Sequence, residues 1–311
     1  MRKRMGMILG TVLLLVALLT GCSLPTGADA TGSPVASDSG GKSQGKLEVL
    51  VLNVGQGDAI LVKTGEQTAL IDTSDLDEQD KLKKELGKAG VKKIDKVILT
   101  HPHADHIGGM DVVLKDFQIG EVYDNGMPST SKIYLRYMKT LKQQKITRHG
   151  LKAGDELDLG GGVKFKVLAP SAKLVQQGTQ KGYKHAPNNE SVVGQLIFGD
   201  FRMMLTGDAE RDEEHSILEA FDQAQLKSQV LKSGHHGSKT SSSKEWLRAV
   251  QPEVALISCG QNNDYGHPHK ETMHKYNALK LQIYETDKNG TVTVTSDGHG
   301  YEIRTEEGKA Q

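Results

Sequence analysis

The stretch of sequence that decides the fold is rich in histidine and follows an apolar run. It is Thr100-His101-Pro102-His103-Ala104-Asp105-His106-Ile107-Gly108-Gly109, directly after Val97-Ile98-Leu99. The apolar run predicts a buried strand that ends where the histidines begin. Histidines two positions apart cannot share a helix face, but they can converge from a tight loop. Three imidazoles and one carboxylate within six positions therefore predict a metal site with room for two ions.

The residue types at this loop also indicate which metal to expect. Nitrogen and oxygen ligands of this kind favour zinc first, with manganese or iron as alternatives. A polar surface turn with chance histidines is the weaker interpretation, because motif matches of this density seldom lack a site.

Residues 101–106 fit the His-x-His-x-Asp-His signature of the metallo-β-lactamase superfamily. Over about residues 47–304 the chain also resembles the metallohydrolase domain of the ComEC-type competence (DNA-uptake) family. Four stretches carry that resemblance: Asn53-Val54-Gly55-Gln56-Gly57-Asp58-Ala59, Leu205-Thr206-Gly207-Asp208, Ser233-Gly234-His235-His236-Gly237-Ser238 and Tyr265-Gly266-His267-Pro268. The resemblance implies an α/β fold, the four-layered αββα sandwich, with a binuclear metal centre. The superfamily hosts many chemistries, so the fold alone does not give the function.

The resemblance also implies roles for residues outside the histidine loop. Asp208 follows an apolar strand, where a carboxylate can bridge two cations, and His267 stands where the superfamily places the final ligand of the second metal. Asp72 is implied as a partner that orients the ligands. Asp58 is a candidate for the same role, with an ordinary hairpin-turn residue as the alternative. The predicted ligands of two divalent ions are His101, His103, Asp105, His106, Asp208 and His267.

One histidine of the superfamily pattern has no counterpart in this chain. Many metallo-β-lactamases have it just before the strand that here begins at Val192, where this chain has Pro187-Asn188-Asn189. His235 or His236 is expected either to replace that ligand or to act as general acid toward the leaving group. Nearby hydroxyls and amides predict contacts to a phosphate oxygen. The candidate substrate-binding residues are Asn189, Ser191, Ser238, Lys239 and Thr240.

The first residues have the pattern of a bacterial secretory signal. Arg2, Lys3 and Arg4 precede an apolar segment that is short for a membrane span, and Leu19-Thr20-Gly21-Cys22 resembles a lipobox. We expect a signal peptide over residues 1–21, lipidation of Cys22 and attachment to the outer face of the cell membrane. A plain secretory signal or an uncleaved anchor is the alternative.

Composition divides the remainder of the chain. Residues 22–46 are mostly Gly, Ser, Ala and Asp and predict a disordered tether, residues 47–304 predict one hydrolase domain, and residues 305–311 predict a polar tail. The polar segment 169–189 predicts a mobile loop. Without residues 1–21 the chain has 36 Lys and Arg against 39 Asp and Glu, a net charge of −3. A strongly basic nucleic-acid footprint is therefore excluded. With Cys22 lipidated, Cys259 is the sole remaining thiol.

The favoured hypothesis is a membrane-tethered phosphodiesterase that uses two metal ions. A water with a lowered pKa attacks phosphorus, and the candidate catalytic residues are Asp105, His235 and His236. The resemblance implies DNA as substrate, whereas the charge and the few aromatic residues leave open a cell-wall phosphodiester such as phosphorylcholine on teichoic acid. Lactone and thioester hydrolysis are further alternatives. The competing class is a non-catalytic domain that binds metal or DNA for an uptake assembly. The sequence gives no indication of an obligate protein partner.

Overall fold

The computed structural model describes residues 45–306. The predicted signal peptide, Cys22, most of the predicted tether and the end of the predicted tail lie outside the described residues. In the described part of the chain, no helix is both long enough and apolar enough to cross a membrane.

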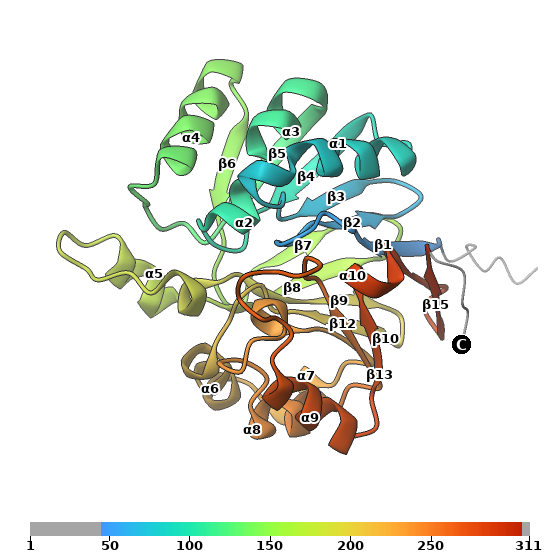
Figure 1. Ribbon diagram of the computed structural model, residues 1–311. Coiled ribbons are helices and arrows are strands. Elements are labelled where there is room, and N and C mark those ends of the chain that lie inside the picture. The colour runs from blue at the N-terminus through green and yellow to red at the C-terminus, as the bar shows by residue number, and fades with distance from the viewer. Residues whose placement is uncertain (1–44, 307–311) are drawn as a thin grey trace, which may run out of the picture. The chain divides into compact units, whose positions relative to one another are not determined.

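Two mixed sheets pack face to face at the centre of the domain (Figure 1). The eight-stranded sheet has the order β15-β14-β1-β2-β3-β4-β5-β6. Its strands are β1 (Leu47–Val51), β2 (Ile60–Lys63), β3 (Thr68–Ile71), β4 (Lys93–Ile98), β5 (Gln118–Asp124), β6 (Thr147–Gly150), β14 (Val292–Ser296) and β15 (Tyr301–Thr305). The seven-stranded sheet has the order β13-β12-β11-β10-β9-β8-β7. Its strands are β7 (Glu156–Asp158), β8 (Lys164–Ala169), β9 (Val193–Phe198), β10 (Phe201–Leu205), β11 (Val230–Lys232), β12 (Val254–Ile257) and β13 (Gln282–Glu285).

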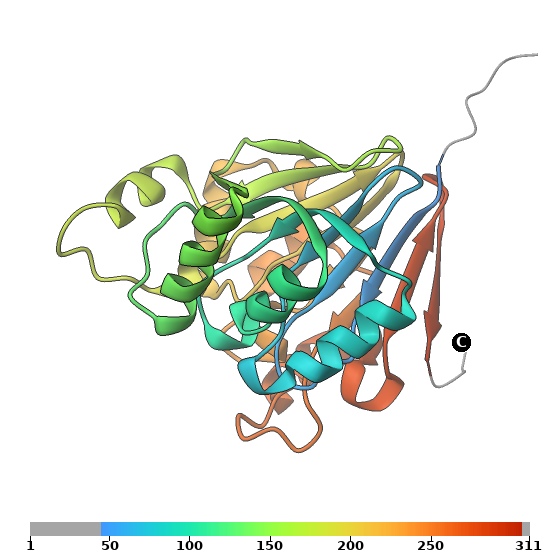
Figure 2. The same ribbon diagram turned by 90° about the horizontal axis from the view of Figure 1, so that it is seen from above.

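Helices cover the outer face of each sheet. Helices α1 (Gln79–Lys88), α3 (Met110–Asp116) and α4 (Lys132–Gln144) lie over the eight-stranded sheet, as the view from above in Figure 2 shows. Helices α6 (Arg211–Ala220), α8 (Lys244–Val250) and α9 (Lys270–Ala278) lie over the other sheet. The short helical segments are η1 (Leu76–Glu78), α2 (Ala104–Ile107), α5 (Ala172–Gly178), η2 (Pro187–Glu190), α7 (Gln223–Leu226), η3 (Gly234–Gly237) and α10 (Thr286–Asn289).

The hydrophobic core has three layers, as two sheets between helices require. Val49, Ile60 and Phe165 belong to the cluster between the two sheets. A second cluster joins the eight-stranded sheet to its helices, and a third, which includes Trp246, does the same for the seven-stranded sheet. Each fully buried large apolar side chain contributes about 1.5–3 kcal/mol to folding. The predicted αββα sandwich is confirmed.

The topology brings the predicted site residues to one edge of the sandwich. Strands β3, β4 and β5 are parallel neighbours, and so are β10, β11 and β12. Ligands in α/β sheets bind beyond the carboxyl ends of such strands. The histidine loop follows β4, Asp208 follows β10, and His236 follows β11. The candidate site therefore lies where the carboxyl ends of the two parallel sets meet.

The prediction of one mobile loop over residues 169–189 was wrong. The segment contains helix α5, which begins after Ser171 and is capped by the Ser171 hydroxyl accepting from the Leu174 amide at 3.2 Å. It ends in η2, where the buried carboxylate of Glu190 accepts from the Ala186 amide at 2.9 Å. These local side-chain bonds to the backbone outweigh the weak apolar pattern of the segment.

Candidate metal centre

The loop that follows β4 is fixed by close backbone packing against the segment that follows β3. The Thr73 amide donates to the His106 carbonyl at 2.7 Å, and the Gly108 amide donates to the Ser74 carbonyl at 2.9 Å. A Cβ atom at Gly109 would collide with the Thr73 carbonyl oxygen, and one at Gly108 would collide with backbone atoms of the same segment. The two glycines of the motif are therefore required by packing, which presses α2 and its side chains against the end of β3.

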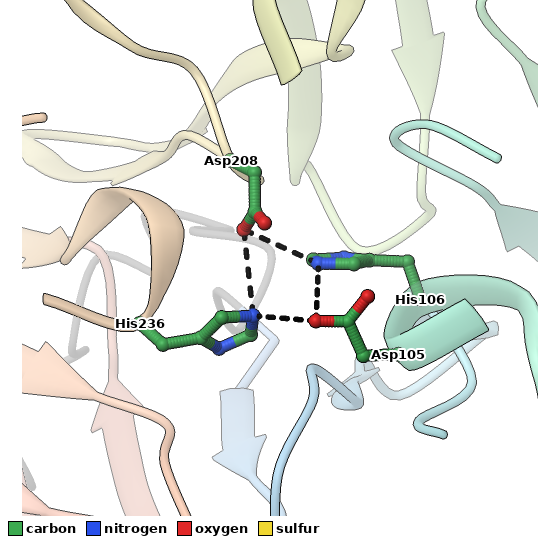
Figure 3. Close-up of side chains that lie close together, drawn as sticks. All are labelled: Asp105, His106, Asp208 and His236. Carbon is green, nitrogen blue, oxygen red and sulfur yellow. Dashed lines mark ion pairs between the residues drawn. The ribbon is translucent and has the colours of Figure 1, made fainter. Parts of the chain in front are cut away.

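Four side chains from three loops converge on one point (Figure 3). Asp208 Oδ1 lies 3.2 Å from His106 Nε2 and 3.5 Å from His236 Nε2. Asp105 Oδ2 lies 3.2 Å from His236 Nε2 and 3.9 Å from His106 Nε2. One ligand atom from each of the four residues lies within 4.8 Å of the others.

The donor atoms of this cluster fit a divalent metal ion. His106 Nε2, His236 Nε2 and Asp208 Oδ1 are buried and have no hydrogen-bond partner within residues 45–306. Buried polar atoms without a partner are costly, so three of them at one point indicate a bound cation. Two imidazoles and two carboxylates form a ligand set that suits zinc, and also manganese or iron.

The electrostatics of the protein groups favour a cation at the same point. Burial opposes ionisation of Asp208, but the neighbouring imidazoles outweigh it and hold the pKa of that carboxyl well below its ordinary value. Burial likewise opposes a charged His236, yet the carboxylates of Asp208, Asp58 and Asp105 raise the pKa of His236 to about 10. The pKa of His106 also lies well above its ordinary value, because surrounding carboxylates overcome its burial. Metal binding must therefore displace protons from these imidazoles.

Asp72 lies behind His106 and fixes the orientation of its ring. The Asp72 carboxylate lies 2.7 Å from His106 Nδ1 and accepts from both the amide and the hydroxyl of Thr100, also at 2.7 Å. A carboxylate on Nδ1 leaves Nε2 free to face the cluster, which is the arrangement seen behind metal-bound histidines. These contacts are the ones that a residue orienting the His106 ring requires.

His101 and His103 lie beside the four-residue cluster, on the other side of the Asp208 carboxylate. His101 Nε2 is 3.0 Å from His103 Nδ1 and 3.8 Å from Asp208 Oδ2. The Ser191 hydroxyl occupies the position next to His101, with its oxygen 3.4 Å from His101 Nδ1, and accepts from the Asp208 amide at 3.3 Å. A buried hydroxyl thus stands beside the second pair of imidazoles, near the strand that follows the missing superfamily histidine.

The two neighbouring histidines of η3 point to different places. His235, His236 and Gly237 all have left-handed backbone angles, with φ of 49°, 52° and 82°. Such angles are strained for residues other than glycine and are common at functional sites. The turn directs His236 into the cluster, while His235 is about a quarter exposed.

The four-residue cluster includes His236, whereas the predicted ligand set includes His267. His267 does not belong to the four-residue cluster, and its ring stacks beside that of His236, with centroids 6.0 Å apart. His236, which was expected as a replacement ligand or an acid, offers the fourth ligand atom of the cluster, as the first of these alternatives requires. The physical reason is the tight turn at residues 235–237, which brings His236 Nε2 to within 3.5 Å of Asp208 Oδ1.

The candidate substrate-binding residues divide into two groups. In the first group, the Asn189 side-chain oxygen accepts from the Glu210 amide at 3.1 Å and so contacts the backbone at the start of α6. Ser191, also in this group, is buried beside His101. The Ser238 and Thr240 hydroxyls lie 3.0 Å apart, and Thr240 Oγ1 lies 3.2 Å from His235 Nδ1. Only the second group, with exposed Lys239, adjoins the partly exposed imidazole of His235.

Two buried charged residues near the site were missed by the sequence analysis. Lys232, at the end of β11, has its ammonium 2.9 Å from Asp58 Oδ2, with neither side chain exposed by more than 1%. Glu213, on α6, is buried close to the Asn188–Ser191 segment. An ionisable residue inside an apolar strand, as in Val230-Leu231-Lys232, was the available signal for the first.

Replacing Glu213 by glutamine is expected to stabilise the protein increasingly as the pH rises. Burial raises the pKa of the Glu213 carboxyl well above 4.5, with Glu190 and Glu214 adding to the rise. The contribution of Glu213 to wild-type stability is therefore fully present below pH 4.5 and falls by about 1.4 kcal/mol per pH unit until its folded-state pKa is reached. Denaturant unfolding of Glu213→Gln at pH 5 and pH 8 tests this. Exposed Glu219→Gln on the same helix is the control, and an equal effect at both pH values would contradict the prediction.

The comparisons with known proteins agree with the fold and the site. Residues 52–126 match the family described as "Metallo-beta-lactamase superfamily". The chain is 31% identical over 264 residues to ComE operon protein 3 of Bacillus subtilis (strain 168), covering 79% of this chain and 32% of that protein. It is also 31% identical over 250 residues to Competence protein ComA of Neisseria gonorrhoeae, covering 80% of this chain and 32% of that protein. The chain thus spans about a third of the length of these relatives.

A solved structure shares the architecture at low sequence identity. The metallo-beta-lactamase fold protein YhfI from Bacillus subtilis matches with a TM-score of 0.53 and 13% identity, covering 80% of this chain and all of that one. The chain therefore carries a domain of the metallo-β-lactamase superfamily, and over most of its length it is homologous to the ComEC-type competence proteins.

Proposed function

We propose that this domain is a metal-dependent phosphodiesterase. The observation that carries the proposal is the cluster of ligand atoms from Asp105, His106, Asp208 and His236. Three of these atoms, His106 Nε2, Asp208 Oδ1 and His236 Nε2, are buried without a hydrogen-bond partner within residues 45–306. His101 and His103, on the other side of Asp208, are the candidate ligands of a second ion. When bound, divalent ions supply Lewis acidity, which lowers the pKa of water and neutralises charge on phosphoryl oxygens.

We assign to His235 the donation of a proton to the leaving group. Its Nδ1 lies 3.2 Å from Glu210 Oε1, and its Nε2 lies 3.6 Å from Asp208 Oδ2 at the edge of the cluster. Because Nδ1 faces the Glu210 carboxylate, Nε2 is the ring nitrogen that faces the site. In hydrolysis, the water oxygen bonds to phosphorus and gives one proton to solvent, the bond to the leaving oxygen breaks, and His235 Nε2 gives a proton to that oxygen.

An exposed aromatic side chain supports a substrate that carries bases. Tyr265 is 63% exposed and lies parallel to the His267 ring, with centroids 5.6 Å apart and planes at 18°. Nucleobases stack on such side chains without regard to sequence. The relatives ComE operon protein 3 and Competence protein ComA bear names from competence, which also favours DNA as the substrate. Phosphorylcholine on a cell-wall polymer is the alternative occupant, since a quaternary ammonium also binds aromatic faces.

Hydrolysis assays on the full chain test the function. We expect turnover of thymidine 5′-(p-nitrophenyl phosphate) that is lost in a chelator and regained with zinc or manganese. Methyl p-nitrophenyl phosphate has the same leaving group and no base, so a lower KM for the thymidine ester is expected if Tyr265 stacks on the base. Equal KM values would favour the cell-wall alternative, while lactone and thioester substrates serve as further tests of the hydrolase class.

The competing candidate is a non-catalytic domain that binds metal or DNA. The observation in its favour is the Ser191 hydroxyl beside His101, near the strand that follows the missing superfamily histidine. A protein that holds metal at the cluster but turns over no phosphodiester, lactone or thioester would establish that alternative.

The cellular location follows from the sequence pattern around Cys22. We propose that the chain is a lipoprotein on the outer face of the membrane, with residues 22–46 as its tether and residues 47–304 as the catalytic domain. Cys22→Ser is expected to block processing after residue 21, measured by the size of the product and by metabolic labelling with a fatty acid. Unchanged processing and unchanged partition with lipid would contradict the proposal.

A further inference from the structure

We propose that the buried ion pair of Lys232 and Asp58 is a positioning device for the metal centre, which fixes His236 and Asp105 so that both face the cluster. The inference rests on the metal binding in the proposed function and adds two residues that are not themselves ligands in the cluster.

The ion pair is enclosed by the protein on all sides. Lys232 Nζ lies 2.9 Å from Asp58 Oδ2, and the side-chain exposures are 0% and 1%. The ammonium also donates to the Ser233 carbonyl at 3.0 Å. Among residues 45–306, Lys232 is the only lysine in the buried class. Removing two charges from water is expensive, so an enclosed pair at the edge of a site calls for a reason other than stability.

Asp58 also lies beside the His236 ring. Its second oxygen, Oδ1, lies 3.5 Å from His236 Nδ1, which also lies 2.9 Å from the Ser258 carbonyl oxygen. The Ser258 hydroxyl in turn donates to the Gly57 carbonyl at 2.7 Å, next to Asp58. His236 Nδ1 thus donates to the Ser258 carbonyl, and the charged Asp58 Oδ1, which has no hydrogen-bond partner within residues 45–306, lies on the same side of the ring. Its Nε2 is left facing Asp105 and Asp208, as a metal ligand must.

Asp58 also holds the backbone of the opposite ligand. The Asp58 amide donates to the Asp105 carbonyl at 3.0 Å, and the Ser74 amide donates to the Asp58 carbonyl at 2.7 Å. Lys232 ends β11 of the seven-stranded sheet, whereas Asp58 lies between β1 and β2 of the other sheet. The ion pair therefore joins the two halves of the cluster, one with Asp105 and one with His236.

The negative charge of the site is a second explanation for a buried lysine at position 232. Four carboxylates lie close together around the cluster, from Asp58, Asp72, Asp105 and Asp208, and three of these are almost fully buried. Lys232, the only buried lysine within residues 45–306, pairs with one of them, Asp58. By holding Asp58, Lys232 keeps that carboxylate out of the ligand set while leaving the others for the metal.

Three variants test the inference, with Co²⁺ as the probe. Lys232→Met is expected to unfold at lower temperature without metal, because it leaves the Asp58 carboxylate buried and unpaired. Asp58→Asn and the double variant Lys232→Met/Asp58→Asn remove that charge. The exposed Lys227→Met is the control. Unfolding is measured on metal-free protein, and Co²⁺ affinity and visible absorption are measured by titration.

The double variant distinguishes a role in positioning the metal ligands from a role in stability alone. We expect it to regain much of the lost thermal stability, yet to bind Co²⁺ about 10–100-fold more weakly than wild type and with an altered ligand-field spectrum, since partners behind a ligand typically contribute that much. Wild-type affinity and spectrum in Asp58→Asn and in the double variant would overturn the inference. Wild-type protein that binds no Co²⁺ would instead overturn the proposed function.

Discussion

Asp208→Asn is expected to lose both bound metal and hydrolytic activity. Asp208 reaches both parts of the site, with Oδ1 near His106 and His236 and Oδ2 near His101 and His235. The substitution keeps the shape of the side chain and removes its charge. Loss of a partner behind a ligand already costs about 10–100-fold, so loss of this central ligand should lower kcat/KM by more than about 10²-fold.

The measurement pairs metal content with activity. Inductively coupled plasma analysis of undialysed protein gives bound metal, and hydrolysis of bis(p-nitrophenyl) phosphate gives kcat/KM. Asp200→Asn is the matched control, because Asp200 lies in the turn at the other end of β10 and its side chain is 83% exposed. Asp208→Asn with wild-type metal content and wild-type kcat/KM would contradict the metal centre described above.

Much of the fold could be predicted because buried strands leave a strong pattern. The antiparallel strands β1, β2 and β3 follow the apolar runs that predicted them, and β4 ends where the histidine loop begins. Helix α5 was missed because Lys173, Gln176 and Gln177 dilute its apolar face, so its formation depends on the Ser171 cap and on tertiary contacts.

The arrangement of the site could be predicted only in part. Residues in one short loop, such as Asp105 and His106, must be near each other, and the family resemblance adds Asp208 from a separate stretch. Whether His236 enters the cluster depends on the backbone angles of residues 235–237, and the residue types in this stretch do not reveal those angles. The contact of Lys232 with Asp58 joins residues 174 positions apart, so no local pattern could reveal it.

His235 and His236 are expected to differ when each is replaced by alanine. His236 Nε2 lies inside the cluster, 3.2 Å from Asp105 Oδ2, so His236→Ala should lower metal content and slow every substrate. His235 lies at the edge and is partly exposed, so His235→Ala should keep wild-type metal content. Of two adjacent residues in one turn, only His236 is thus expected to lose bound metal when it is replaced, which metal analysis measures directly.

The leaving group then shows whether His235 is the general acid. An alkoxide leaving group needs a proton in the transition state, whereas p-nitrophenolate departs without one. Loss of a general acid costs about 10²–10⁴-fold, so His235→Ala should lower kcat/KM by that factor for a dialkyl phosphodiester such as dinucleoside phosphate and change little for a p-nitrophenyl ester. Equal loss on both substrates with intact metal would assign His235 to substrate binding. Loss of metal from His235→Ala would make it a ligand, and the acid would then have to come from another residue.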